Sequence, residues 1–179
     1  VSDAAKGKMK NRKTPIASFY ANLMAFDGYY EKKWFPYTMP ISDIYGLRAA
    51  FNLIAEDATL YERHARIGSA TRAAVKEAGL KLHLQSGFSN TVTVFDIPQC
   101  TDAKSILDTM RTKYNIMLAG SFDELSGKVI RIGHMGENAR LEHMVPTLEA
   151  LSATLTELGV TLKGNLADLF LKYYRKKEA

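Results

Sequence analysis

Apolar side chains recur at helical spacing in the second quarter of the chain. They follow one another at intervals of three or four residues, at Ile44, Leu47, Phe51, Ile54 and Ala58. This period places them on one face of an amphipathic helix. Ser42 suits the N-cap and Gly79 suits the C-terminal stop, so the pattern predicts a long helix over 42–79, either straight or kinked.

The chain before this helix is expected to hold shorter elements. Residues 2–10 favour a short helix capped by Ser2 or Asp3, and the stretch 19–30 favours a second one. The segment 34–40, WFPYTMP, contains two prolines and three aromatic residues. Proline interrupts both helices and central strands, so this segment is predicted to be an ordered loop.

The second half of the chain alternates between strand and helix patterns. Strands are predicted over 81–85, 91–98, 115–120 and 128–135, and helices over 102–113, 139–158 and from 165 onward. This order predicts a small α/β (α+β) domain over 80–179, in which a mostly antiparallel sheet carries helices on one face. Residues 1–41 do not fit inside that domain and are expected to pack against something else.

Composition narrows the class of protein. The chain has 179 residues, of which 46% are hydrophobic and 24% charged, as in ordinary globular proteins. Its single cysteine allows no intrachain disulfide and fits a reducing compartment, so a cytoplasmic location is expected. No apolar run approaches the length of a membrane span, and we expect no membrane partner.

The net charge of +5 raises the question of an anionic partner. Much of the basic charge lies at the two ends of the chain, where it favours either nucleic-acid or membrane binding or simply two solvated ends. No aromatic platform is interleaved with these charges, as single-strand binders require. We therefore expect solvated ends and no nucleic-acid partner.

Common catalytic motifs are missing from the sequence. It contains no dinucleotide-binding or Walker glycine motif, no C-x-x-C pair and no H-E-x-x-H. The four histidines have no metal-ligand spacing, so no metal site is predicted. Cys100 has no nearby histidine to activate it and is expected to be an ordinary thiol.

One charged residue interrupts an apolar strand. Arg131 lies in the middle of GKVIRIGHMG, residues 127–136, among β-branched apolar neighbours. A guanidinium there can clamp a carboxylate or phosphate through two parallel hydrogen bonds. It can also pair with a local acid such as Asp123 or Glu124, or lean out at the edge of the sheet. The residue types alone leave these alternatives open.

A second candidate is the loop PYTMP, residues 36–40. The hydroxyl of Thr38 and the phenol of Tyr37 lie between two prolines and offer a rigid pair of donors for an anion. An ordinary packed aromatic loop explains the same composition. Neither this loop nor Arg131 names a reaction by itself.

Several of these segments together resemble a known family. VSDAAKGKM, NRKTPIASFY, FPYTMPISDIYGLRAAFNLIAEDA and NIMLAGSFDELSGKVIRIGHMG follow one another in the order seen in the C-terminal half of class V pyridoxal-phosphate aminotransferases. The chain is most similar to the alanine–glyoxylate and serine–pyruvate group. The resemblance covers residues 1–159 and implies the fold-type I architecture and a homodimer-type assembly.

The resemblance implies a division of the chain and roles for its candidate residues. Residues 1–41 correspond to the end of the large cofactor domain with its active-site loop, 42–79 to the interdomain helix, and 80–179 to the small C-terminal domain. Arg131 corresponds to the arginine that binds the substrate's α-carboxylate. Thr38 corresponds to the threonine that reaches the phosphate of pyridoxal 5'-phosphate in the neighbouring subunit.

Two departures from the family pattern bear on activity. Some members carry a tyrosine three residues before that threonine, where this chain has Phe35, and Tyr37 is the candidate to replace it at the cofactor. The family's Schiff-base lysine lies upstream of the first residue of this sequence, so the resemblance implies that an N-terminal half must supply it. No catalytic residue is therefore assigned here, and the chain alone is expected to be inactive.

The function expected from the resemblance is amino transfer from a small amino acid, alanine or serine, to a small 2-oxo acid, glyoxylate or pyruvate. The alternative is a non-catalytic module derived from the same fold, which binds carboxylates or another protein. The exposed apolar character of residues 14–41 favours the first reading, because a lone domain should not leave such a surface in water.

Overall fold

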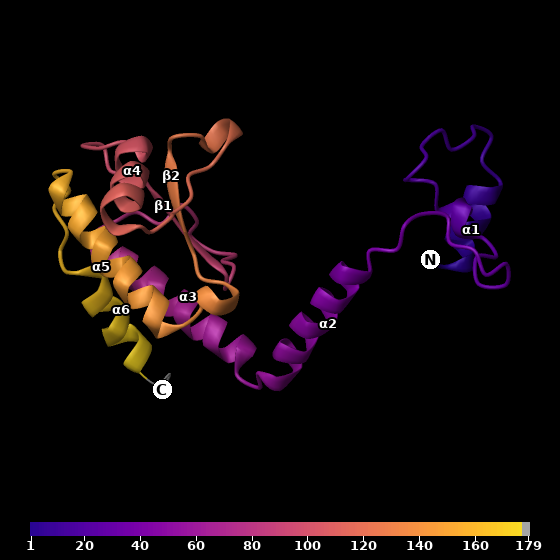
Figure 1. Ribbon diagram of the computed structural model, residues 1–179. Coiled ribbons are helices and arrows are strands. Elements are labelled where there is room, and N and C mark those ends of the chain that lie inside the picture. Colours follow the sequence, from indigo (N-terminus) through magenta and orange to yellow (C-terminus); the bar gives the residue numbers. More distant parts are fainter. Residues whose placement is uncertain (177–179) are drawn as a thin grey trace. The chain divides into compact units, whose positions relative to one another are not determined.

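A computed structural model describes residues 1–176 of the chain. The chain divides into two compact units, one from Val1 to Glu56 and the other from Asp57 onward. Figure 1 labels the helices and strands of both units. No helix within residues 1–176 is both long enough and apolar enough to cross a membrane.

The first unit contains short elements and one longer helix. Helix α1 spans Asp3–Lys10 and is capped by the Ser2 side chain, which accepts from the Ala5 N–H. The predicted helix over 19–30 is wrong: only a short 3-10 helix, η1, forms at Leu23–Phe26. Its aromatic neighbours pack against the proline-rich loop, and the left-handed Gly28, at φ +73°, turns the chain away.

The segment predicted as one long helix, 42–79, consists of two helices. Helix α2 spans Ile41–Glu56 and α3 spans Leu60–Glu77, so the first begins before Ser42. Asp57 accounts for the interruption, because its carboxylate accepts from the Thr59 N–H and hydroxyl and binds Arg63 through both oxygens. These hydrogen bonds compete with continuation of the helix, as aspartate side chains commonly do. They also lower the pKa of Asp57, with the Arg63 bond as the main cause.

The sheet of the second unit has two antiparallel strands, β1 (Val92–Asp96) and β2 (Val129–Gly133). Their register pairs Phe95 with Ile130 and Val94 with Arg131. Because successive side chains point to opposite faces, Phe95 and Ile130 lie on one face and Arg131 on the other. Phe95 and Ile130 are fully buried in the core, so the face that they share packs against the helices.

The other two predicted strands, 81–85 and 115–120, are reduced to single pairings. Leu82 forms an isolated bridge with Phe95 of β1, and Ala119 forms one with Arg131 of β2. Both segments therefore lie beside the strands of the sheet, but neither keeps the ladder beyond one residue pair.

Three further helices complete the second unit. Helix α4 spans Ala103–Tyr114, α5 spans Leu141–Glu157, and α6 spans Leu166–Arg175. The predicted caps of α4 and α6 are confirmed, since the side chains of Asp102 and Asn165 accept from backbone N–H groups of the first turn. Two short 3-10 helices flank β2 in the chain: η2 at Asp123–Leu125 and η3 at Gly136–Asn138.

The hydrophobic core lies between the sheet and helices α3, α4, α5 and α6. Helix α6 packs against α3 and α5, and Figure 1 shows these three helices side by side. Fully buried members from four elements are Ile67 of α3, Phe95 of β1, Leu148 of α5 and Phe170 of α6. This packing holds β2, and with it Arg131, on a rigid support.

Candidate functional site

Arg131 occupies the third position of β2, on the sheet face opposite the core. Its neighbours Ile130 and Ile132 point into the core and are fully buried, which fixes the direction of the arginine side chain. A slip of one residue in the register would bury the guanidinium and expose both isoleucines. The apolar alternation of β2 therefore determines where the charge is presented.

The backbone of Arg131 is paired on both sides of the strand. It lies opposite Val94 of β1, and on its other side its N–H donates to the Ala119 carbonyl at 2.7 Å. The Ala119 N–H returns a bond of 3.3 Å to the Arg131 carbonyl. Arg131 is thus an interior position of the sheet, and the alternative of an arginine leaning out at a free edge does not describe it.

The guanidinium of Arg131 contacts the segment that follows this bridge. Its Nε donates to the Gly120 carbonyl at 2.5 Å, and its Cζ lies 5.4 Å from the centroid of the Phe122 ring. Within residues 1–176, no carboxylate lies within 4.0 Å of the guanidinium, so neither Asp123 nor Glu124 pairs with it. The half-buried positive charge is left without an anion from the described chain.

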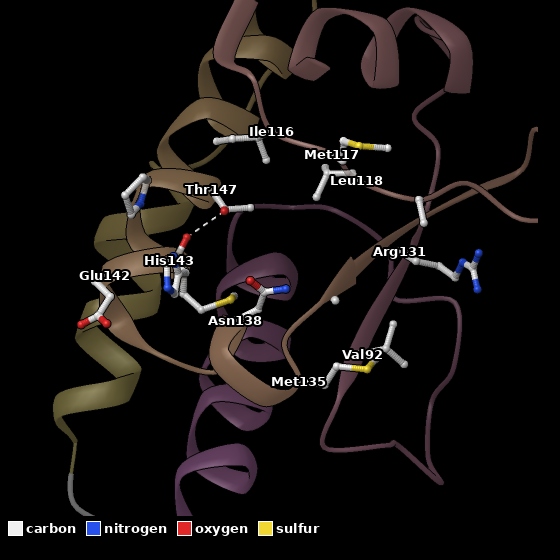
Figure 2. Close-up of a pocket in the computed structure, with 14 residues that line it drawn as sticks. Val92, Ile116, Met117, Leu118, Arg131, Met135, Asn138, Glu142, His143 and Thr147 are labelled. Carbon is white, nitrogen blue, oxygen red and sulfur yellow. Dashed lines mark hydrogen bonds between the residues drawn. The ribbon is translucent and has the colours of Figure 1, made fainter. Parts of the chain in front are cut away.

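A pocket of about 600 Å³ lies beside β2. It is lined by the 116–119 segment, β2, η3 and the first turns of α5. Figure 2 shows the Arg131 side chain extending away from Ile116, Asn138 and His143, so its guanidinium lies apart from the polar side chains of α5. The contacts of the guanidinium are instead with Gly120 and Phe122, which do not line this pocket.

The exit of β2 is anchored by a buried histidine. His134 is fully buried, with Nδ1 3.1 Å from the Asn90 carbonyl and Nε2 2.9 Å from the Thr93 hydroxyl. Because a carbonyl can only accept, these partners assign the proton to Nδ1, and Nε2 accepts from Thr93. Burial lowers the pKa of His134 to about 4, so the ring is neutral at pH 7. It ties the end of β2 to β1 without adding charge beside Arg131.

The loop with the second pair of candidates belongs to the first unit. The Tyr37 hydroxyl donates to the Phe19 carbonyl, and its ring packs against Phe19, Tyr20 and Phe26 at centroid distances of 5.1 to 5.4 Å. Thr38 follows with an exposed side chain. The structure therefore does not present Thr38 and Tyr37 as two equivalent donors, because the phenolic proton of Tyr37 is already engaged.

The predicted residues fall into two groups. Tyr37 and Thr38 are neighbours in the first unit, whereas Arg131 belongs to the second. In the part of the chain that the structure describes, no three histidine, cysteine, aspartate or glutamate side chains gather as a metal site would require.

Comparison with known proteins gives the chain its family. It is 36% identical over 149 residues to an uncharacterized aminotransferase of Methanocaldococcus jannaschii, covering 81% of this chain and 38% of that protein. It is 38% identical over 130 residues to the serine–glyoxylate aminotransferase of Arabidopsis thaliana, covering 70% and 32%. The chain belongs to the class V aminotransferases. No family model matches it.

A solved structure of this aminotransferase family supports the fold as well. Pyridoxamine–pyruvate aminotransferase from Mesorhizobium loti superimposes with a TM-score of 0.84 at 30% identity, over 97% of this chain and 46% of that one. The predicted fold class, the small α/β domain of the fold-type I transferases, is confirmed. The chain spans less than half the length of each of these three relatives, a share that fits the predicted C-terminal half.

Sequence reasoning missed the contacts of this aminotransferase segment around Arg131. Gly120 accepts through its backbone carbonyl, a group that every residue has, so the residue type does not indicate the contact. Phe122 is an isolated aromatic residue outside any periodic pattern, and single exposed apolar residues are common on protein surfaces. The predicted strand over 115–120 pointed to this region, but its neighbour in the sheet was not predicted.

Proposed function

We propose that this chain is part of a pyridoxal-phosphate aminotransferase that moves an amino group from alanine or serine to glyoxylate or pyruvate. The family membership and the substrates in the names of the relatives support this class of reaction. The single observation that carries the proposal is the Arg131 guanidinium, which is fixed by Nε while no carboxylate of residues 1–176 pairs with it.

Arg131 would bind the substrate through its two Nη groups. A guanidinium presents parallel N–H donors whose spacing matches the two oxygens of a carboxylate. Amino acids and 2-oxo acids share an α-carboxylate, so one arginine serves both the donor and the acceptor. The half-buried position of Arg131 strengthens the attraction relative to a fully solvated charge.

The first unit would contribute to the cofactor phosphate. The exposed hydroxyl of Thr38, held between Pro36 and Pro40, fits a single hydrogen bond to a phosphate oxygen of a neighbouring subunit in a homodimer-type assembly. Tyr37 can take part only if its bond to the Phe19 carbonyl exchanges for one to the phosphate. Bound pyridoxal phosphate supplies the electron sink for the reaction.

The lysine that carries the cofactor would come from an N-terminal half of the family fold. The test is to combine this chain with such a half and to measure pyruvate formed from alanine in the presence of glyoxylate. Amino transfer that requires both parts supports the proposal. A folded complex without amino transfer contradicts it, and pyruvate binding without turnover would instead support the alternative of a non-catalytic carboxylate-binding module.

A further inference from the structure

Two contacts from one short segment fix the Arg131 side chain. The Gly120 carbonyl accepts from Nε at 2.5 Å, and the Phe122 ring lies 5.4 Å from Cζ, within the range of a cation–π contact. No hydrogen bond from either Nη is found within residues 1–176. The segment therefore contacts the guanidinium at Nε and at Cζ, and among the described residues it leaves both Nη groups without a hydrogen bond.

We propose that Phe122 is a positioning residue for Arg131. Its ring holds the guanidinium plane while the Gly120 carbonyl fixes Nε, so that both Nη groups meet the substrate carboxylate already oriented. This inference rests on the proposed carboxylate-binding role of Arg131. Phe122 acts through the arginine and is not itself assigned a contact with the substrate.

The backbone of Phe122 is well placed for this task. Ala119 is bonded to the Arg131 backbone in both directions, which sets the start of the segment beside β2. The Phe122 carbonyl accepts from the Leu125 N–H at 3.2 Å, which closes the η2 turn directly after the ring. The segment is thus tied down on both sides of the guanidinium contact.

Hydrophobic burial does not explain the position of the Phe122 ring. The residue is 70% exposed, and it is absent from the core cluster and from the side chains packed against that cluster. Arginine loses much rotamer freedom when it is ordered, and pre-orientation removes part of that cost from the binding step. The ring contact supplies such pre-orientation at the place where the arginine needs it.

The chain offers a matched control for this contact. Arg72 and Phe88 form a second arginine–phenylalanine pair in the same unit, with Cζ 4.9 Å from the ring centroid. Phe88 is also exposed. Its replacement removes a contact of the same kind at a place that takes no part in the proposed carboxylate site.

The test compares four variants in the complex with the lysine-bearing half. Phe122→Leu removes the ring, Phe122→Tyr keeps it, Phe88→Leu is the matched control, and Arg131→Met removes the clamp. With pyruvate as the probe, we expect Phe122→Leu to raise KM about two- to fivefold at unchanged kcat, as for loss of uniform binding. Phe122→Tyr should restore the wild-type KM, and Phe88→Leu should leave it unchanged.

A second measurement uses the 179-residue chain without any cofactor. In ¹⁵N NMR spectra, the Arg131 Nε–H should exchange slowly with water and carry a ring-current shift. Phe122→Leu should speed this exchange and abolish the shift, and Phe88→Leu should change neither. An Arg131 Nε–H signal that is identical in wild type and Phe122→Leu overturns the inference.

The outcomes separate the two proposals. If Arg131→Met leaves the KM for pyruvate unchanged, the carboxylate role of Arg131 fails, and the positioning role fails with it. If Arg131→Met raises KM while Phe122→Leu does not, only the positioning role is overturned. A fall in kcat without a rise in KM for Phe122→Leu also contradicts positioning for binding.

Discussion

The two compact units differ in what they do with apolar side chains. The second unit buries a contiguous core that runs from α3 through the sheet to α6. The first unit has no buried residue, and apolar side chains along α2, including Leu47, Phe51 and Ile54, are about half exposed or more. Both units contain helices with apolar side chains at regular spacing. Only the second unit buries these side chains against its own residues.

This difference shows that helical periodicity predicts an apolar face but not the surface that covers it. In the second unit the face of α3 meets β1 and α6. In the first unit the apolar face of α2 is exposed. Large exposed apolar patches often mark sites where another protein binds. The proposed N-terminal half of an aminotransferase is a partner that would cover it.

The largest predicted effect separates the units by stability. Phe170 is fully buried and Phe51 is 61% exposed. Phe170→Ala should lower the free energy of unfolding by about 3–5 kcal/mol, because a cavity replaces the ring. Phe51→Ala should change it by less than about 0.5 kcal/mol. Urea denaturation of both variants checks the pair, and equal losses would contradict the contrast between the units.

The next effect concerns pH and is confined to the second unit. Burial lowers the pKa of His134 in the folded chain to about 4, from the ordinary value of 6.5 that applies to the unfolded chain. Between these two values the unfolded chain binds more protons than the folded chain. Stability is therefore lost as pH falls through the window from 6.5 to 4, by about 2–3 kcal/mol between pH 7.5 and 4.5.

The variant His134→Gln isolates this pH effect. Glutamine does not titrate, so the free energy of unfolding of the variant should vary less with pH over this window than that of the wild type. This holds whatever the stability of the variant at pH 7.5. Urea denaturation at several pH values gives the comparison. The same pH slope in wild type and variant would exclude His134 as its source.

A smaller difference is expected in local opening. The backbone amides of α2, a helix without buried residues, should exchange hydrogen at least about tenfold faster than those in the middle of α5. Exchange followed by mass spectrometry on the isolated chain resolves the two helices. Equal protection would mean that α2 is covered in solution.

The smallest effect is expected from a surface ion pair of the second unit. Lys113 and Glu157 lie in contact on α4 and α5, but both side chains are about half exposed. Solvent screening should leave Glu157→Gln with the melting temperature of wild type. A clearly lower melting temperature would show that exposed ion pairs contribute more to the stability of the second unit than we expect.

Much of the second unit was predictable from local patterns. The caps Asp102 and Asn165, the alternation around Arg131 and the apolar face of α5 all express short-range rules that the structure obeys. The predictions were wrong where tertiary contacts override these short-range rules. In the stretch 19–30, aromatic rings pack against Tyr37 of the loop and no α-helix forms. Asp57 interrupts the helix predicted over 42–79, although the apolar spacing continues beyond it.

The candidate site was predictable in part for the same reason. A charged residue in an apolar strand stands out, so Arg131 was identified from its position. Its supports at Gly120 and Phe122 come from a segment that only strand pairing brings near. A carbonyl and an isolated exposed ring leave no trace in a sequence pattern. The roles of Arg131, Thr38 and Tyr37 toward substrate and cofactor stay predictions.

The most direct test of the central claim is the KM for pyruvate of the complex carrying Arg131→Ala. The control is Arg111→Ala, which removes an exposed arginine that pairs with Asp108 on α4. Loss of a charge-assisted pair of hydrogen bonds predicts a KM raised about ten- to hundredfold for Arg131→Ala and unchanged for the control. An Arg131→Ala complex with the KM and kcat of wild type would contradict the account.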